Sequence, residues 1–255
     1  MTTLPGTPNP EAPNPQLPIV QRLRIRYTKR GRLRFTSHRD FGRAFERALR
    51  RAQIPIGFSS GFSPHPRISY AGASPTGAAS EAEYLEIGLN REVEPAWVQS
   101  ELDAALPAGL DIVDVVVATP GALADLLEAS QWQLNLGRVD LAAVCVATGK
   151  FLAAKSVEVE RMTKKGLRRF DCRAAVVSLA AHTNEPEDPD CAILDLVVRH
   201  GTPSVRPDDV LAGLRETGGL ELTDTPLANR VAQGPLNLQT GTVGDPFTHD
   251  RDVSA

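Results

Sequence analysis

The chain has 255 residues, 42% of them hydrophobic, which is enough for one large domain or two of ordinary size with a packed core. Its three cysteines, Cys145, Cys172 and Cys191, exclude a disulfide framework, a zinc knuckle and the three closely spaced thiolates of a site-differentiated iron–sulfur cluster. No apolar run approaches the roughly 18 residues of a membrane span, and the cysteine content predicts a reducing, cytoplasmic location.

Positive charge is concentrated in one segment of the chain. Between Arg22 and Arg67, thirteen Lys and Arg residues stand against two acidic residues, whereas the rest of the chain holds fifteen Lys and Arg against twenty-nine acidic residues. A basic segment inside an acidic protein indicates an anionic partner for that segment. A solvated arginine face would give the same pattern.

The chain begins with a proline-rich stretch and then alternates apolar and charged residues. Residues 1–20 carry no cation and no apolar run, which predicts a disordered tail. From Arg22 to Tyr27 the period of two predicts a half-buried strand. A turn at residues 29–31, followed by Leu33 and Phe35, predicts that this strand continues into a hairpin.

A helix with one apolar and one basic face follows. Ser37 and Asp40 have the spacing of a capping box, so the helix is expected to start at Ser37, and Pro55 ends it. Apolar residues recur along it at helical spacing as far as Ala52. The residues that fall away from this stripe are Arg39, Arg43, Arg47, Arg50 and Arg51.

The remaining elements repeat one order twice. After the helix come two strands, a helix that Pro95 opens and another strand, which is the split βαβ, or ferredoxin-like, order. A similar series follows, with Pro207 opening the corresponding helix and Leu220 beginning the last strand. We therefore predict an α+β fold of two tandem ferredoxin-like units with antiparallel sheets and a cleft between them. The expected parts are a disordered tail (1–20), a basic first unit (21–118), a connector (119–130), a second unit (131–232) and a flexible tail (233–255).

Two of the candidate sites lie around the basic helix. At its start, beside His38, unpaired amides and the helix dipole could hold a phosphate, although capping alone explains the residues there. In the stretch GFSPHPRISY, two prolines hold His65 on a rigid loop between Phe62 and Tyr70, whose rings could stack on a base. The alternative for this loop is a stiff crossover between two elements.

Two further groups have the composition of a site. Glu81 and Glu83 share one face of a strand, and with His38, Asp40 and His65 they could form an acid–base or metal-binding set. Their spacing matches no ligand motif, so we predict no metal site. The basic segment TKKGLRRFDCR could contact a polyanion or form a solvated hairpin tip. The full set of predicted binding residues is Arg39, Arg43, Arg47, Arg50, Arg51, Phe62, His65, Arg67, Lys164, Lys165, Arg168 and Arg173.

Several joined motifs resemble the radical SAM-linked family, a domain of unknown function found free or fused behind cobalamin-binding radical S-adenosylmethionine proteins. The matching pieces are K-x-G-x-L-R-F-x-S-H-x-D, E-R-A-L-R-R-A, G-F-x-P-H-P-x-I and S-E-A-E-Y, and the similarity is strong over residues 22–118. Arg39 and Phe41 replace two leucines of the family pattern, which makes this chain more cationic there. The resemblance implies a partner of a radical SAM protein, with no settled activity of its own.

The leading interpretation is a non-catalytic module that binds RNA, tRNA among the candidates, and presents it to a radical SAM partner. S-adenosylmethionine and the iron–sulfur cluster are expected only in that partner, because this chain lacks the cysteines for a cluster. The chain also has no GxSxG, Walker A, GxGxxG or HExxH motif. The alternatives are a metal- or acid–base-dependent enzyme that uses His38, His65 and nearby carboxylates, and an adaptor for an acidic protein.

Overall fold

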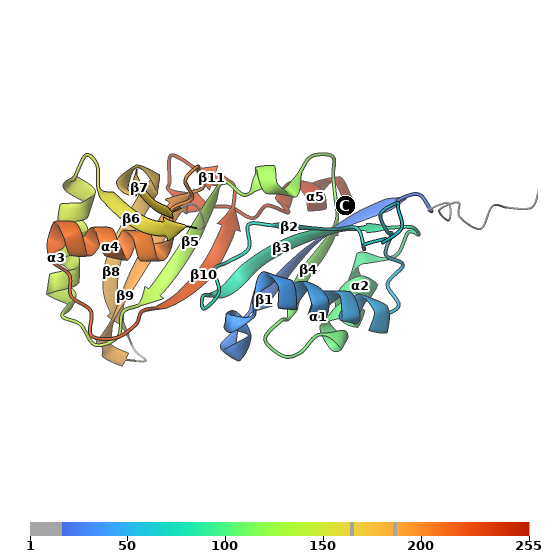
Figure 1. Cartoon of the computed structure of the whole chain (residues 1–255), viewed down its shortest axis with the longest axis horizontal. Helices are drawn as coiled ribbons and strands as arrows, with labels where there is room; N and C mark the ends of the chain where they lie inside the picture. The colour runs from blue at the N-terminus through green and yellow to red at the C-terminus, as the bar shows by residue number, and fades with distance from the viewer. Residues whose placement is uncertain (1–16, 164–165, 186–187, 255) are drawn as a thin grey trace, which may run out of the picture.

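The computed structural model describes residues 17–163, 166–185 and 188–254, and it has the predicted α+β class (Figure 1). One eight-stranded, mostly antiparallel sheet runs the length of an elongated body. Its strand order is β4-β1-β3-β10-β5-β9-β8, and β2 pairs with β3.

The first half of the chain forms one end of this sheet. Its elements are β1 (Gln21–Lys29), a 3-10 helix (Gly31–Phe35), α1 (His38–Arg51), β2 (Ile68–Ala71), β3 (Ala79–Leu89), α2 (Pro95–Ala105) and β4 (Ile112–Val117). The pairs β1–β3, β1–β4 and β2–β3 are all antiparallel. Figure 1 shows α1 and α2 below these strands and the last helix, α5 (Thr248–Ser254), above them.

The second half forms the other end of the sheet. After a 3-10 helix (Leu123–Leu126) come β5 (Ala129–Asn135), α3 (Leu141–Ala153), β6 (Glu158–Thr163), β7 (Gly166–Asp171), a 3-10 turn (Arg173–Ala175), β8 (Val176–Asn184), β9 (Asp188–Arg199), α4 (Pro207–Gly218) and β10 (Leu227–Gly234). β5 lies between β10 and β9, β8 pairs with β9, and β6 and β7 form a separate hairpin. Two short strands, β11 (Leu236–Asn237) and β12 (Thr242–Val243), precede α5.

The two halves share one sheet, which corrects the expected cleft between two separate sheets. β3 and β10 pair in parallel, with Asn229 opposite Ala79 and Arg230 opposite Ser80. The β2–β3 loop lies beside this pairing, because the Gly72 carbonyl accepts a hydrogen bond from Arg230 of β10. The division into two ferredoxin-like units remains an interpretation of the strand order.

Each half has its own hydrophobic core. In the first, Phe45 and Leu49 of α1 pack against Leu23 and Ile25 of β1. The second core forms between α3, α4 and the strands β5 and β9, around residues such as Phe151. Helix α1 begins as predicted, because the Ser37 hydroxyl accepts a hydrogen bond from the Asp40 amide at 3.2 Å.

Three local predictions differ from the structure. Leu33 and Phe35 belong to a 3-10 helix and not to a hairpin strand. The helix begins at Gly31, whose φ of 54° turns the chain. The last strand of the second half starts at Leu227, and not at Leu220. The predicted flexible tail from residue 233 folds back onto the first half as far as residue 254, where Phe247 is fully buried.

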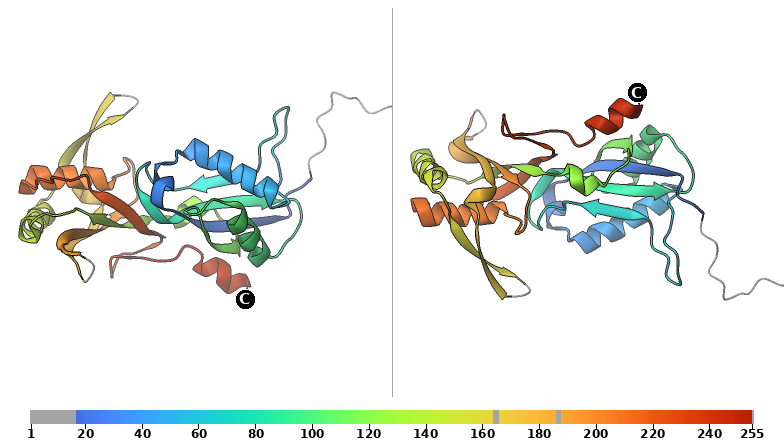
Figure 2. Two further views of the ribbon diagram at one scale, coloured as in Figure 1. Left: turned by 90° about the horizontal axis from the view of Figure 1, so that it is seen from below. Right: turned by 90° about the horizontal axis from the view of Figure 1, so that it is seen from above.

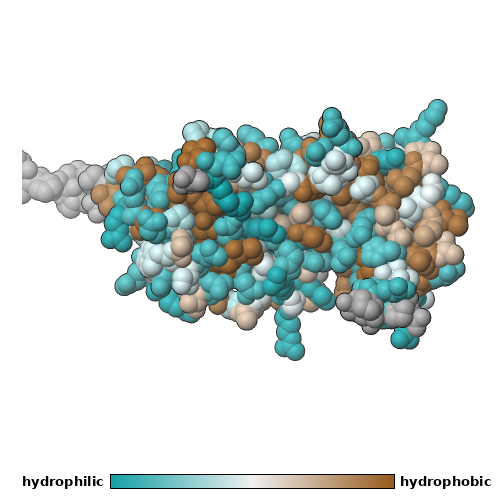
Figure 3. Space-filling model, turned by 180° about the vertical axis from the view of Figure 1, so that it is seen from behind, coloured by the Kyte–Doolittle hydropathy of each residue, from teal (hydrophilic) through white to brown (hydrophobic). Residues whose placement is uncertain are grey.

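The face seen from behind in Figure 3 carries its hydrophobic residues in small groups among hydrophilic ones. Among the described residues, no helix combines the length and the apolar character that crossing a membrane requires.

Candidate functional site

The basic face of α1 is exposed. Arg39, Arg43, Arg47 and Arg50 all face solvent, and none of their guanidinium groups makes a hydrogen bond or ion pair with a described residue. Arg51 differs, because its Nη1 donates to the carbonyl of Ala105 at 3.2 Å. Four of the five predicted arginines of α1 are therefore free to meet a ligand.

The loop between α1 and β2 is a narrow protrusion, visible in Figure 2 near the C-terminal end of α1. Phe58 and Pro66 pair across it, the Ser59 amide donates to the His65 carbonyl at 2.8 Å, and the His65 amide donates to Ser59 Oγ at 3.0 Å. Phe62 lies at the tip with 96% of its surface exposed. Phe62 therefore does not belong to the hydrophobic core.

His65 and Arg67 lie at the base of this loop, beside a cavity of about 400 Å³ that Arg22 and Glu86 also line. An ion pair between Arg22 and Glu86, 2.9 Å from Nη1 to Oε1, closes one side of it. His38 is absent from this lining and faces a different cavity. The two predicted histidines are therefore not parts of one site.

The carboxylates of the predicted acid–base set have separate roles. Asp40 accepts a hydrogen bond from the Ser37 hydroxyl at 2.7 Å and so completes the helix cap. Glu81 forms an ion pair with Arg30 at the surface, and Glu83 is buried beside Arg230. Within the described part of the chain, no group of three or more His, Cys, Asp or Glu residues could hold a metal ion.

The second basic segment is only partly available to a ligand. Lys164 and Lys165 lie outside the described residues. Arg168 is exposed on β7. Arg173 donates to the Leu152 carbonyl at 3.2 Å and to the Val176 carbonyl at 3.0 Å. Its guanidinium group therefore links two backbone segments of this chain and is not free to bind a ligand.

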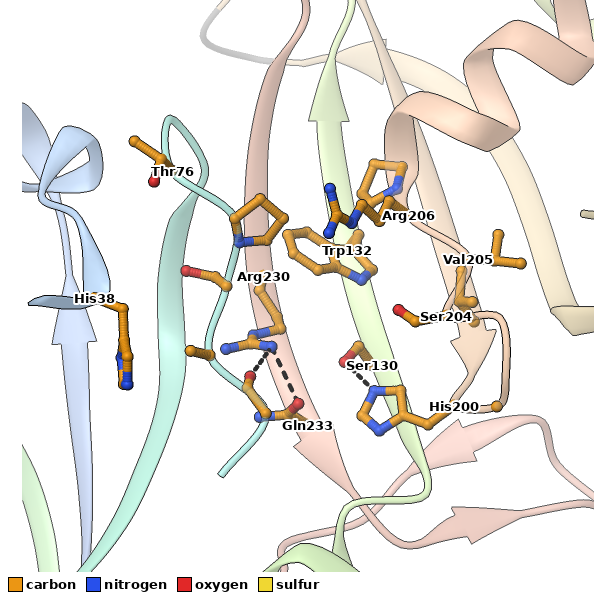
Figure 4. A pocket seen from close by; sticks show the side chains of 17 residues that line it. His38, Thr76, Ser130, Trp132, His200, Ser204, Val205, Arg206, Arg230 and Gln233 are labelled. Carbon is orange, nitrogen blue, oxygen red and sulfur yellow. Dashed lines mark hydrogen bonds between the residues drawn. The ribbon is translucent and has the colours of Figure 1, made fainter. Parts of the chain in front are cut away.

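A cavity of about 520 Å³ lies where the two halves meet (Figure 4). The start of α1, the β2–β3 loop, strands β5 and β10, and the segment from β9 to the start of α4 all contribute to its wall. Two arginines and two histidines line it, and none of its lining residues is acidic. Its polar side chains are those of His38, Ser74, Thr76, Ser130, Trp132, His200, Ser204, Arg206, Arg230 and Gln233. Of the predicted site residues, only His38 lies here.

Arg230 anchors the floor of this cavity and is only 3% exposed. Its guanidinium group donates to the Gly72 carbonyl at 2.6 Å, to Gln233 Oε1 at 3.0 Å, to Ser80 Oγ at 3.3 Å and to the carboxylate of Glu83. The Trp132 ring lies 5.5 Å from the guanidinium carbon. These contacts fix the guanidinium group between a buried carboxylate and an aromatic face.

A hydroxyl–imidazole pair lies on another wall. His200 Nδ1 is 2.6 Å from the Leu127 carbonyl, which can only accept, so Nδ1 carries the proton and Nε2 accepts from the Ser130 hydroxyl at 2.7 Å. Partial burial of the ring lowers the pKa of His200, Arg230 lowers it further, and the bond to Leu127 acts in the opposite direction. The imidazole is therefore neutral at pH 7.

Sequence reasoning missed Ser130, His200, Arg206 and Arg230. Ser130 and His200 lie in two different strand regions, 70 positions apart, and they match no catalytic motif. The available signal was Arg230 itself, a lone cation between small and apolar residues near the end of the second half.

The comparisons with known proteins place the chain in a family without assigning it an activity. No curated protein matches it. It is similar to a chain in a crystal structure of a Cbf5-Nop10-Gar1 complex, at 10% identity and a TM-score of 0.42, covering 84% of this chain but 50% of that one. It is also similar to an unknown protein from Galdieria sulphuraria, at 14% identity and a TM-score of 0.24, covering 83% of this chain and 98% of that one.

A family model matches residues 22–207, which is most of the chain and includes α1, the protruding loop and the start of α4. The description of that family names no partner, so the link to radical SAM proteins stays a prediction. The chain belongs to DUF2344, a family of uncharacterized proteins conserved in bacteria.

Proposed function

We propose that this protein binds structured RNA, with tRNA as the first candidate, along the basic face of α1. The row of exposed guanidinium groups on α1, without partners among the described residues, supports this proposal most directly. Arg39, Arg43 and Arg47 follow one another at four-residue intervals, about 6 Å apart along the axis. Such a row suits the successive charges of a phosphate backbone.

The proposed role is to present the RNA to a radical SAM protein. Its support is the resemblance of the motifs between Lys29 and Tyr84 to the radical SAM-linked family. All three cysteines are free, which fits a reducing cytoplasm. The acid–base alternative has lost its support, because His38, His65 and Glu81 lie in separate surroundings.

Replacing Arg43, Arg47 and Arg50 together with glutamine is expected to weaken RNA binding without unfolding the protein. The slope of log K against log salt should become shallower by roughly 2 units, since each lost phosphate contact removes about 0.7–0.9 from it. Fluorescence anisotropy with labelled tRNA over a salt series measures both quantities. The matched control replaces three exposed arginines elsewhere, Arg91, Arg138 and Arg215, and should keep the wild-type slope. Wild-type binding that does not respond to salt, or equal losses in both variants, would contradict the proposal.

Phe62 provides a second, non-electrostatic test. Phe62→Ala should weaken RNA binding by about 1–3 kcal/mol, the usual contribution of one base stacked on an aromatic ring. Its melting temperature should be unchanged, because Phe62 is 96% exposed. Phe62→Tyr keeps a stacking face and should bind as the wild type does. Equal affinity of the alanine variant and the wild type would remove the loop from the interface.

A further inference from the structure

The cavity between the two halves is lined by hydrogen-bond donors and by two arginines, and none of its lining residues is acidic. We propose that it is a binding site for a phosphate group, carried by a small nucleotide or by an unpaired nucleotide of RNA. The second source rests on the RNA-binding function proposed above, whereas the site itself does not.

Several donors on the cavity wall lack acceptors among the described residues. Ser74 is 9% exposed, and its hydroxyl has no hydrogen-bond partner. The Trp132 indole nitrogen, which Figure 4 shows on the side towards Ser204 and His200, forms no hydrogen bond within the described chain. Arg230 uses four of its five N–H groups. A buried hydroxyl without a partner is costly, so a ligand or solvent oxygen is expected beside Ser74.

The charges around the cavity favour an anion. Beneath it, the two buried cations Arg230 and Lys29 face one buried carboxylate, that of Glu83. At its edge, the Arg206 guanidinium group makes no ion pair with a described residue, and His38 stands on the opposite side (Figure 4). Low-dielectric walls strengthen the attraction of such charges for an anion.

The arrangement of the donors favours phosphate over carboxylate. The donors come from α1, the β2–β3 loop, β5, β10 and the start of α4, and so they converge from several directions. A tetrahedral phosphate accepts hydrogen bonds in all of these directions, whereas a planar carboxylate accepts them in one plane. The volume of about 520 Å³ leaves room for a sugar and a base beside the phosphate.

Isothermal titration with inorganic phosphate and with adenosine monophosphate tests the site directly. Both should bind the wild-type protein, and adenosine without phosphate should not. Arg206→Gln should weaken adenosine monophosphate binding about 10-fold to 100-fold, since it removes a charged donor at the edge. Arg215→Gln, an exposed arginine at the other end of α4, is the matched control and should bind as the wild type does.

Ser74→Ala separates ligand binding from structure. Removing a buried hydroxyl that has no partner should leave the melting temperature unchanged or raise it, while the affinity for adenosine monophosphate falls. Absence of binding by either phosphate compound, or unchanged affinity in both Arg206→Gln and Ser74→Ala, would overturn the proposal.

The α1 variant that lacks Arg43, Arg47 and Arg50 distinguishes whether a small nucleotide or RNA carries the phosphate. This variant should still bind adenosine monophosphate, so failure of the RNA proposal leaves the site intact. If RNA supplies the group, bound tRNA should displace adenosine monophosphate from the wild type but not from the α1 variant. If tRNA binds without displacing it, the site serves a free nucleotide.

Discussion

Replacing Glu83 with glutamine is expected to lower the free energy of unfolding by about 3–5 kcal/mol, because it leaves buried positive charge without a counterion. Glu83 is 2% exposed and pairs with Arg230, and its Oε2 accepts from the Ser74 amide at 3.1 Å. The Lys29 ammonium group lies in the same buried cluster, where it donates to the carbonyls of Ser74 and Pro75 at 3.3 Å each. The melting temperature should fall by roughly 6–20 °C.

The pKa of Glu83 agrees with this role. Burial acts to raise the pKa of the carboxyl group. The neighbouring charges and hydrogen bonds from Arg230, Ser80, Lys29 and Ser74 outweigh burial and lower the pKa below its usual value. The carboxylate is therefore ionised at pH 7 and balances cations that would otherwise be buried alone.

Glu81→Gln is the matched control, two residues along the same strand. Glu81 pairs with Arg30, but the two side chains are 27% and 52% exposed, so losing the pair should cost less than about 1 kcal/mol. A double variant, Glu83→Gln with Arg230→Gln, should be less destabilised than the sum of the two single variants. Chemical denaturation measures the wild type and all four variants. Similar losses for Glu81→Gln and Glu83→Gln would show that the buried cluster does not stabilise the fold.

The parts of the fold that local patterns determine were predictable from the sequence. Helix α1 carries its own start at Ser37, its apolar stripe and its end before Pro55, so its boundaries and its exposed arginines follow from residues close in the chain. Leu33 and Phe35 predict a strand that does not form, because two alternating residues are too few to separate a strand from a 3-10 helix.

The site at the junction could not be predicted in the same way. Arg230 and Glu83 are 147 positions apart in the sequence and form an ion pair because β3 and β10 pair in parallel. No local sequence pattern predicts this strand pairing. His38 begins α1, whereas His65 lies in the loop that follows it, and the two line different cavities. The chemistry of their side chains suggested a shared site, but the length of the helix separates them.

The C-terminal segment gives the second large expected effect. Asp250→Asn should lower the free energy of unfolding by about 3–5 kcal/mol at pH 7, because it replaces the carboxylate that pairs with the buried Arg24 guanidinium group by an uncharged amide. Both side chains are 1% exposed, with Arg24 Nη1 2.7 Å from Asp250 Oδ1. Asp250 Oδ1 also accepts from the amide of Thr119 at 2.9 Å and from its hydroxyl at 2.6 Å. The sequence predicts a flexible tail here, but this buried pair ties it to β1.

The pH dependence identifies the Asp250 charge as the cause. Burial acts to raise the pKa of Asp250, but hydrogen bonds from Arg24 and Thr119 lower it below its usual value. A lowered pKa in the folded state stabilises the protein above the unfolded value of about 3.9, and this contribution is lost as the pH falls through the folded value. The difference in unfolding free energy between the wild type and Asp250→Asn should thus be constant from pH 7 to pH 5 and shrink below pH 4. Asp252→Asn, on the exposed side of α5, should match the wild type at pH 7. If Asp250→Asn also matches it, the C-terminal segment does not stabilise the first half through this pair.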